Sequence, residues 1–177
     1  MKGWKIVSET VLRGRVFNVR RDTINIDDRR IVREVVEHPG AVAIIPVLDT
    51  GEIILVRQYR HAVGDELLEI PAGTIEDGEK PEECAERELV EETGYRAGTL
   101  VKIGEYFLAP GYSTELIHLF KAARLVKVGA DNQEDEDIMI VPCRFEDALE
   151  MVDRGLIRDA KTIAGLFIFS RNVPSRS

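Results

Sequence analysis

Residues 73–95 read GTIEDGEKPEECAERELVEETGY. The second half of this segment predicts a helix from about Pro81 to Thr93, because proline is tolerated in the first helical turn and Gly94 stands where a C-terminal cap belongs. Acidic residues crowd the start of the predicted helix, as the helix dipole favours. The first half contains glycines, which allow a backbone to approach a ligand closely. The segment therefore predicts a loop, either a plain connection or a ligand-binding one, directly ahead of an acidic helix.

Three carboxylates of the predicted helix share one face. Glu88, Glu91 and Glu92 stand at positions i, i+3 and i+4, a spacing at which like charges destabilise an isolated helix. A solvated acidic face is one interpretation of this pattern. A metal site is the other, because Leu89 and Ala85 form only a narrow apolar flank beside the acids. Mg²⁺ and Mn²⁺ also prefer the oxygen ligands that clustered carboxylates provide.

Outward from this segment, the chain alternates between strand and helix patterns without a regular repeat. Gly40 opens the apolar run 41–48, which suits a buried strand, and a turn at 49–51 returns the chain into a partner strand at 53–56. Further strands are expected at 16–19, 23–26, 31–37, 116–120 and 138–141, and further helices at 145–152 and 161–170. This order of elements predicts an α+β sandwich.

The segment 73–95 resembles the Nudix box, in which a glycine, a glutamate and an Arg-Glu-apolar-any-Glu-Glu-any-Gly-apolar run stand at fixed spacing. The pattern is filled without a gap by Gly73, Glu79, Arg87, Glu88, Leu89, Glu91, Glu92, Gly94 and Tyr95. Tyr95 is a mild departure, since an aliphatic residue is commoner there. Nearly the whole chain is similar to the ADP-ribose pyrophosphatase subfamily, through residues 33–38, 57–60, 67–73 and 159–162 and through Pro110, which lies 16 residues beyond Gly94. Pyrophosphatases of other nucleotide sugars share several of these markers.

This resemblance implies an α+β Nudix fold, a mixed sheet sandwiched between helices, with an added N-terminal antiparallel sheet. It implies a Nudix hydrolase domain over 39–177 and a homodimer built partly from the sheet region 1–38. The implied reaction is Mg²⁺-dependent hydrolysis of ADP-ribose to AMP and ribose 5-phosphate, with Mn²⁺ as a substitute. Hydrolysis of GDP-mannose or another nucleoside diphosphate sugar is the alternative, and a non-catalytic ligand sensor is a third interpretation.

The resemblance also implies roles for individual residues. Glu88 and Glu92 would hold the metal, with Glu91 and the carbonyl of Ala72. Arg87 and Glu79 would pair with each other and brace the loop. The polar segment 131–137 reads as a solvated acidic loop on its own, but the family context makes Glu134 the general base and Glu136 a metal ligand.

Four further residues are candidates for substrate binding. Arg60 resembles a diphosphate-binding arginine, and a guanidinium fork suits phosphate oxygens; a plain charge at a strand end is the alternative. Arg33 and Glu34 resemble residues that meet the adenine, across the dimer in one interpretation, and an exposed strand pair is the other. Pro110 is the subfamily marker.

Composition excludes some classes of protein. The net charge of −8 argues against a nucleic-acid-binding surface, which needs clustered Lys and Arg. The sequence shows no apolar run long enough for a signal peptide or a membrane span. Cys84 and Cys143 lack metal-ligand spacing, and free thiols in a reducing cytoplasm are expected rather than a disulfide.

Overall fold

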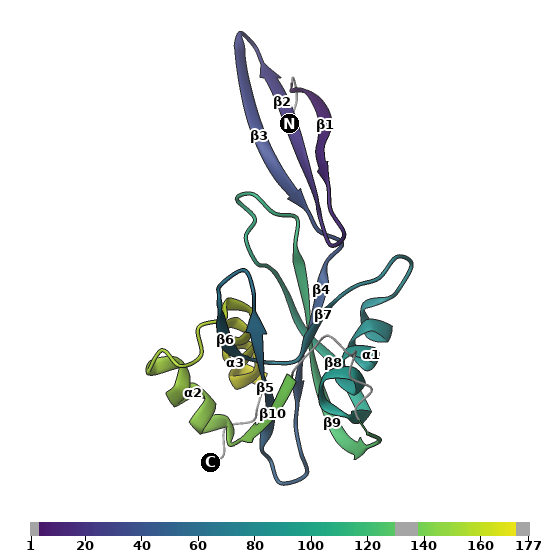
Figure 1. The fold of residues 1–177 in the computed structure, drawn as a ribbon, viewed down its shortest axis with the longest axis vertical. Helices are drawn as coiled ribbons and strands as arrows, with labels where there is room; N and C mark the ends of the chain where they lie inside the picture. Colours follow the sequence, from purple (N-terminus) through teal and green to yellow (C-terminus); the bar gives the residue numbers. More distant parts are fainter. Residues whose placement is uncertain (1–3, 130–137, 173–177) are drawn as a thin grey trace.

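The computed structural model describes residues 4–129 and 138–172. Within these residues the strands and helices follow the order β1 Lys5–Arg13, β2 Asn18–Ile26, β3 Arg29–Glu37, β4 Ala41–Pro46, β5 Ile53–Arg60, β6 Asp65–Glu69, β7 Ala72–Thr74, α1 Pro81–Thr93, β8 Tyr95–Phe107, β9 Leu116–Lys127, β10 Ile138–Cys143, α2 Phe145–Asp153 and α3 Ala160–Asn172. The strands form three sheets, of which the first projects away from the rest of the molecule (Figure 1).

The projecting sheet consists of β1, β2 and β3, and both of its strand pairs are antiparallel. Its presence confirms the added N-terminal sheet, but its strands are longer than the sequence patterns predicted. The strands expected at 16–19 and 23–26 are wrong as separate elements, because one continuous strand runs over 18–26, and β1 was not predicted. Asp27, in the turn between β2 and β3, has a positive φ of 50°.

The central sheet has the strand order β7-β4-β9-β8 and is mixed, since β4 runs parallel to β9 while the other pairs are antiparallel. Every residue of β4 is buried, and its side chains point alternately into two hydrophobic cores, one on each face of the sheet. Ala43 and Ile45 pack on the side of α3, whereas Val42 and Ile44 pack on the side of α1. This arrangement confirms a mixed sheet between helices.

The third sheet has the order β10-β5-β6 and is antiparallel. The sequence pattern predicted that 53–56 pairs with 41–48 as a hairpin, and this was wrong. Only an isolated bridge joins Val47 to Ile53, after which β5 enters a different sheet from β4. A short turn between two apolar runs does not distinguish a hairpin from a strand that crosses to another layer.

The helices follow the predicted bounds closely. Helix α1 has Pro81 in its first turn and ends at Gly94, whose φ of 71° is the left-handed cap that glycine adopts without strain. Its buried side includes Ala85 and Leu89, which pack against β4 and β9, so the acidic face turns toward β7. Both cysteines are free thiols. No helix among the described residues is long and apolar enough to cross a membrane.

Candidate active site

Arg87 ties the carboxylates of α1 to the loop before it. Its Nε and Nη2 donate to Glu79 Oε1 and Oε2 at 2.9 and 3.0 Å, and its Nη1 donates to Glu88 at 2.6 Å and Glu91 at 3.1 Å. Its Nη2 also lies 3.3 Å from the carbonyl of Thr74. These hydrogen bonds, above all those that Arg87 donates to Glu79, raise the pKa of Arg87, and Arg87 in turn lowers the pKa of Glu79 to about 2. The expected Arg87–Glu79 pair is therefore present.

Glu88 and Glu92 both meet the backbone of β7. Glu92 is 5% exposed, and its Oε2 accepts the backbone N–H of Ala72 at 3.0 Å. A Cβ built on Gly73 would lie 1.8 Å from the Cδ of Glu88, so a side chain here would displace that carboxylate from its position against β7. The glycine ahead of the helix thus serves close approach between loop and carboxylate.

The donor chemistry here fits a hard divalent cation. Two carboxylates from one helix face lie against a strand whose carbonyls are further oxygen donors, and Mg²⁺ takes such oxygens together with water. Among residues 4–129 and 138–172, no three His, Cys, Asp or Glu side chains lie close enough together to hold a metal ion without other ligands. Arg87 is hydrogen-bonded to Glu88 and Glu91, so a cation would compete with this guanidinium for their oxygens.

A cleft of about 240 Å³ also borders β7. It is lined by Ala41, Arg60, Ala72, Gly73, Thr74, Leu108, Glu115, Ile117 and Lys161. Arg60 donates from Nε and Nη2 to Glu69 at 2.9 and 2.8 Å, a bidentate pair with a carboxylate that is 1% exposed. Burial works to raise the pKa of Glu69, but the bonds and charges of Arg60 and Lys161 hold it below its ordinary value. The structure therefore brings Arg60 next to Ala72.

Arg33 and Glu34 lie on β3 of the projecting sheet, and both are exposed. Arg33 donates to its neighbour's carbonyl, that of Val32, and Glu34 accepts from Arg21 at 3.3 Å. Neither residue lines the cleft beside Arg60. Pro110 is exposed in the loop between β8 and β9, and this loop is hydrogen-bonded to the end of β3 through Val36.

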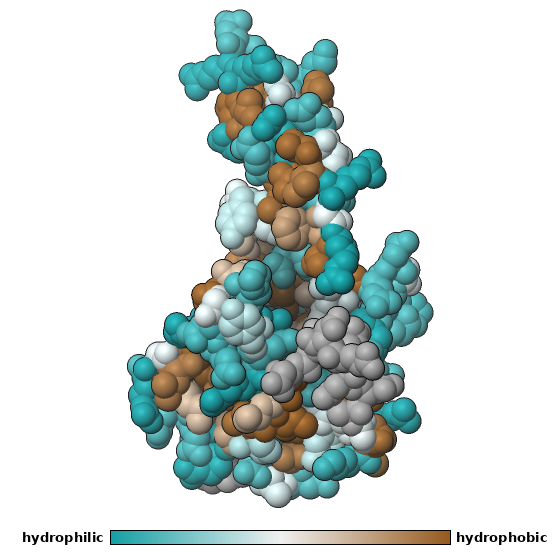
Figure 2. All heavy atoms as spheres, in the orientation of Figure 1, coloured by the Kyte–Doolittle hydropathy of each residue, from teal (hydrophilic) through white to brown (hydrophobic). Residues whose placement is uncertain are grey.

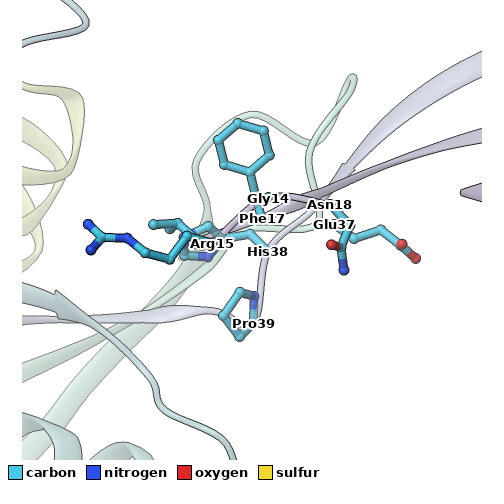
Figure 3. A pocket seen from close by; sticks show the side chains of 8 residues that line it. Gly14, Arg15, Phe17, Asn18, Glu37, His38 and Pro39 are labelled. Carbon is cyan, nitrogen blue, oxygen red and sulfur yellow. The ribbon is translucent and has the colours of Figure 1, made fainter. Parts of the chain in front are cut away.

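A hollow of about 450 Å³ lies at the base of the projecting sheet, where the turn between β1 and β2 faces the residues that lead into β4 (Figure 3). Phe17 and His38 line it, and the side chain of Arg15 extends away from Glu37 (Figure 3). Arg15 also lines a wider hollow of about 720 Å³ whose other wall includes Arg87 and Glu88. The N-terminal sheet therefore borders the carboxylate face of α1.

Two predicted residues, Glu134 and Glu136, lie outside the described residues. Glu69 and Lys161 lie at the site but were assigned no role from the sequence, although the segments 67–73 and 159–162 were noted as subfamily markers. Sequence spacing could not join them, because they are 92 positions apart and meet where the start of α3 lies beside the end of β6. A glutamate among the apolar residues at the end of a strand was the sequence feature that could have pointed to Glu69.

The chain is similar to several known proteins. The chain is 39% identical over 160 residues to an ADP-ribose pyrophosphatase of Bacillus subtilis (strain 168), covering 89% of this chain and 86% of the relative. It is 35% identical over 178 residues to a GDP-mannose pyrophosphatase of Cronobacter sakazakii, covering 90% and 91%. A crystal structure of an ADP compounds hydrolase superposes with a TM-score of 0.84 at 26% identity, covering 97% of this chain and 94% of that one. The NUDIX domain profile matches residues 37–166, and the chain therefore belongs to the NUDIX family.

Proposed function

We propose that this protein hydrolyses the diphosphate of ADP-ribose to AMP and ribose 5-phosphate, with Mg²⁺ as cofactor and Mn²⁺ as a substitute. The observation that carries the proposal is the pair Glu88 and Glu92 against the backbone of Ala72 and Gly73, with Arg60 in the cleft that the same strand lines. This arrangement supports a diphosphate substrate, because carboxylates suited to a metal and a guanidinium suited to phosphate oxygens both lie beside one short strand.

The carboxylate face of α1 is assigned to the metal. Glu88, Glu92 and the carbonyl of Ala72 would hold Mg²⁺, with Glu91 beside them. When bound, the cation polarises phosphoryl oxygens and favours formation of hydroxide near neutral pH. Arg87 orients Glu88 and Glu91 through its hydrogen bonds, and Glu79 keeps Arg87 in place.

The hydrolysis needs a base that takes a proton from a water molecule while the oxygen of that water forms a bond to one phosphorus. The bridging oxygen then leaves with the other phosphorus. We assign the base to Glu134 and a further metal-ligand role to Glu136, both outside the described residues, on their resemblance to the subfamily.

Binding of the substrate is assigned to Arg60, Arg33, Glu34 and Pro110. Arg60 supports the role by lining the cleft at β7, and its guanidinium suits phosphate oxygens. Arg33 and Glu34 carry donors and acceptors suited to an adenine edge, and Pro110 marks the loop that is hydrogen-bonded to the base of their sheet.

We further propose that residues 1–38 form a dimerisation region and that 39–177 form the hydrolase domain. Brown, apolar side chains lie along the projecting sheet (Figure 2), and Ile6, Val7 and Leu12 are more than half exposed. Monomeric soluble proteins rarely expose large contiguous apolar patches, so a second copy of the chain is the expected cover. The two free thiols support a reducing, cytoplasmic location.

A GDP-mannose pyrophosphatase activity is the second candidate, and the similarity to the Cronobacter sakazakii protein favours it. The decisive experiment is a substrate panel of ADP-ribose, GDP-mannose, ADP-glucose and diadenosine polyphosphates with Mg²⁺, in which chromatography separates the products. We expect the highest kcat/KM for ADP-ribose, because a site that matches the hydrogen-bonding edge of adenine rejects guanine. A higher value for GDP-mannose would transfer the proposal to that substrate.

A further inference from the structure

A buried carboxylate joins two cations beside β7. Glu69 is 1% exposed and accepts the two hydrogen bonds from Arg60 described above. Its Oε2 also accepts a hydrogen bond from the ammonium of Lys161, whose side chain is 13% exposed. An isolated buried carboxylate is costly, and charged partners are what make its burial tolerable.

Lys161 is held in place from several directions. Its Nζ lies 3.1 Å from Asp159 Oδ2, and its backbone carbonyl accepts a hydrogen bond from Tyr106 at 2.8 Å. Asp159 in turn accepts bonds from the backbone N–H and the hydroxyl of Thr162 at the start of α3. The ammonium therefore has a fixed position at the junction of α3 with β6 and β8.

These contacts alone would be explained by a structural role that fastens α3 to β6. The lining of the cleft supports a second role, in ligand binding. Arg60 and Lys161 both line it, and the backbone of Ala72 and Gly73, against which Glu88 and Glu92 lie, lines it too. Among the described residues, the contacts above engage two of the five N–H donors of Arg60 and two of the three of Lys161, and further N–H groups of both cations can contact a ligand in the cleft.

We propose that Lys161 is a second phosphate-binding residue beside Arg60, and that Glu69 is a positioning residue that aims both cations at one phosphoryl group of the substrate. The proposal rests on the proposed diphosphate hydrolysis and adds two residues to it. The cleft of about 240 Å³ is smaller than typical pockets for whole drug-sized ligands, and a phosphoryl group with part of its sugar suits it. A guanidinium fork and a compact ammonium are complementary ways to contact phosphate oxygens.

The test compares Lys161→Met with Lys161→Arg in steady-state hydrolysis of ADP-ribose, with inorganic pyrophosphate as a competitive inhibitor. Loss of one charged hydrogen bond should raise KM and the pyrophosphate Ki of Lys161→Met roughly ten- to hundredfold, with a much smaller change in kcat. Lys161→Arg keeps the charge and should restore both constants to within about threefold. Lys121→Met is the matched control, because this ammonium lies 5.7 Å from the ring of Phe169 and does not line the cleft.

Glu69→Gln tests the positioning role. It keeps the shape and one acceptor but removes the charge that both cations share, so KM and Ki should rise in the same direction as in Lys161→Met. A purely structural network predicts a lower Tm with unchanged KM and Ki, and this result would overturn the proposal. If Lys161→Met does not fold, Lys161→Gln replaces it, and an unchanged Ki there would equally reject the role.

Failure of the proposed function gives a different result. A wild-type protein that hydrolyses nothing in the substrate panel would refute the hydrolase assignment. Calorimetric titration of pyrophosphate then still decides the role of Lys161, because the wild type should bind it at least tenfold more tightly than Lys161→Met. Equal affinities in that titration would reject the phosphate-binding role independently of any activity.

Discussion

Two kinds of contact divide the carboxylates of this site. Glu79, in the loop before α1, and Glu91 accept hydrogen bonds from Arg87, which also donates to Glu88, whereas Glu92 accepts the backbone N–H of Ala72. The guanidinium of Arg87 offsets part of the mutual repulsion among these acids. A substitution should therefore affect stability or chemistry differently according to whether the carboxylate serves Arg87 or faces β7.

Glu88→Gln and Glu92→Gln should each lower kcat at least about a hundredfold, since a lost metal ligand forfeits several kcal/mol of transition-state stabilisation. The fold should survive, because glutamine retains one oxygen acceptor and each change relieves repulsion on the helix. Circular dichroism checks that the fold survives, and single-turnover kinetics check that the chemical step is slowed. Glu86→Gln, on an exposed site of the same helix, is the control and should keep its activity. Full activity in both variants would refute the assigned metal face.

Glu79 should make stability depend on pH. Its folded pKa of about 2 lies below the ordinary value of 4.5, because of the bonds from Arg87 above all. A depressed pKa contributes stability that is present above pH 4.5 and is lost as the pH falls from 4.5 toward 2. Solvent screening limits the contribution to roughly 1–2 kcal/mol. Urea unfolding should show Glu79→Gln less stable than the wild type at pH 6, with the difference closing toward pH 2.5; a constant difference would contradict the shift.

At the scale of elements, the helices could be predicted and the sheet pairing could not. Helix α1 followed from Pro81, Gly94 and a spacing of carboxylates that lies within one segment of the chain. Strand β5 was assigned to β4 because the two are adjacent in sequence, yet its ladders form with β6, which follows it directly, and with β10, 80 to 90 positions later. The carboxylate face was predictable for the same reason as its helix, whereas Glu69 and Lys161 depend on how α3 packs, which no local pattern records.

Gly165 is where α3 depends on close packing. A Cβ at this position would lie 2.8 Å from Ile70 Cδ1 and 3.3 Å from Leu119 Cδ1. Helix propensity alone favours alanine over glycine by roughly 0.5–1 kcal/mol, but overpacking a core costs roughly 1–3 kcal/mol. Gly165→Ala should therefore be destabilising overall by about 1 kcal/mol, measured by urea unfolding. Gly104→Ala, where the new Cβ would meet Ile168 at 3.4 Å, is a milder comparison. A stabilised Gly165→Ala would show that α3 shifts to accept the methyl group.

At the scale of the whole molecule, the projecting sheet has apolar side chains that none of the described helices covers. Strand register puts Val7, Thr23 and Val32 in one cross-strand row, and Ile6, Ile24 and Ile31 in the next row, on the opposite face. Arg33 and Glu34 follow Val32 on the same strand, away from the cleft beside Arg60. A dimer would thus explain both the exposed rows and the distance in the fold between these residues and the cleft, if each subunit's sheet reaches the site of the other.

This explanation makes a prediction about mass and affinity together. Val7→Glu combined with Val32→Glu puts two like charges in one row and should yield a monomer by light scattering at micromolar concentration. If Arg33 and Glu34 of the partner subunit complete the adenine site, the monomer should also show a KM for ADP-ribose raised roughly tenfold or more, because charged hydrogen bonds to the base are lost. Val101→Glu, an exposed valine on β8, is the control and should stay dimeric with an unchanged KM. A variant that remains dimeric would refute the sheet as the interface. A monomer with the wild-type KM would instead place the adenine contacts within one subunit, because a site completed by the partner cannot survive its removal.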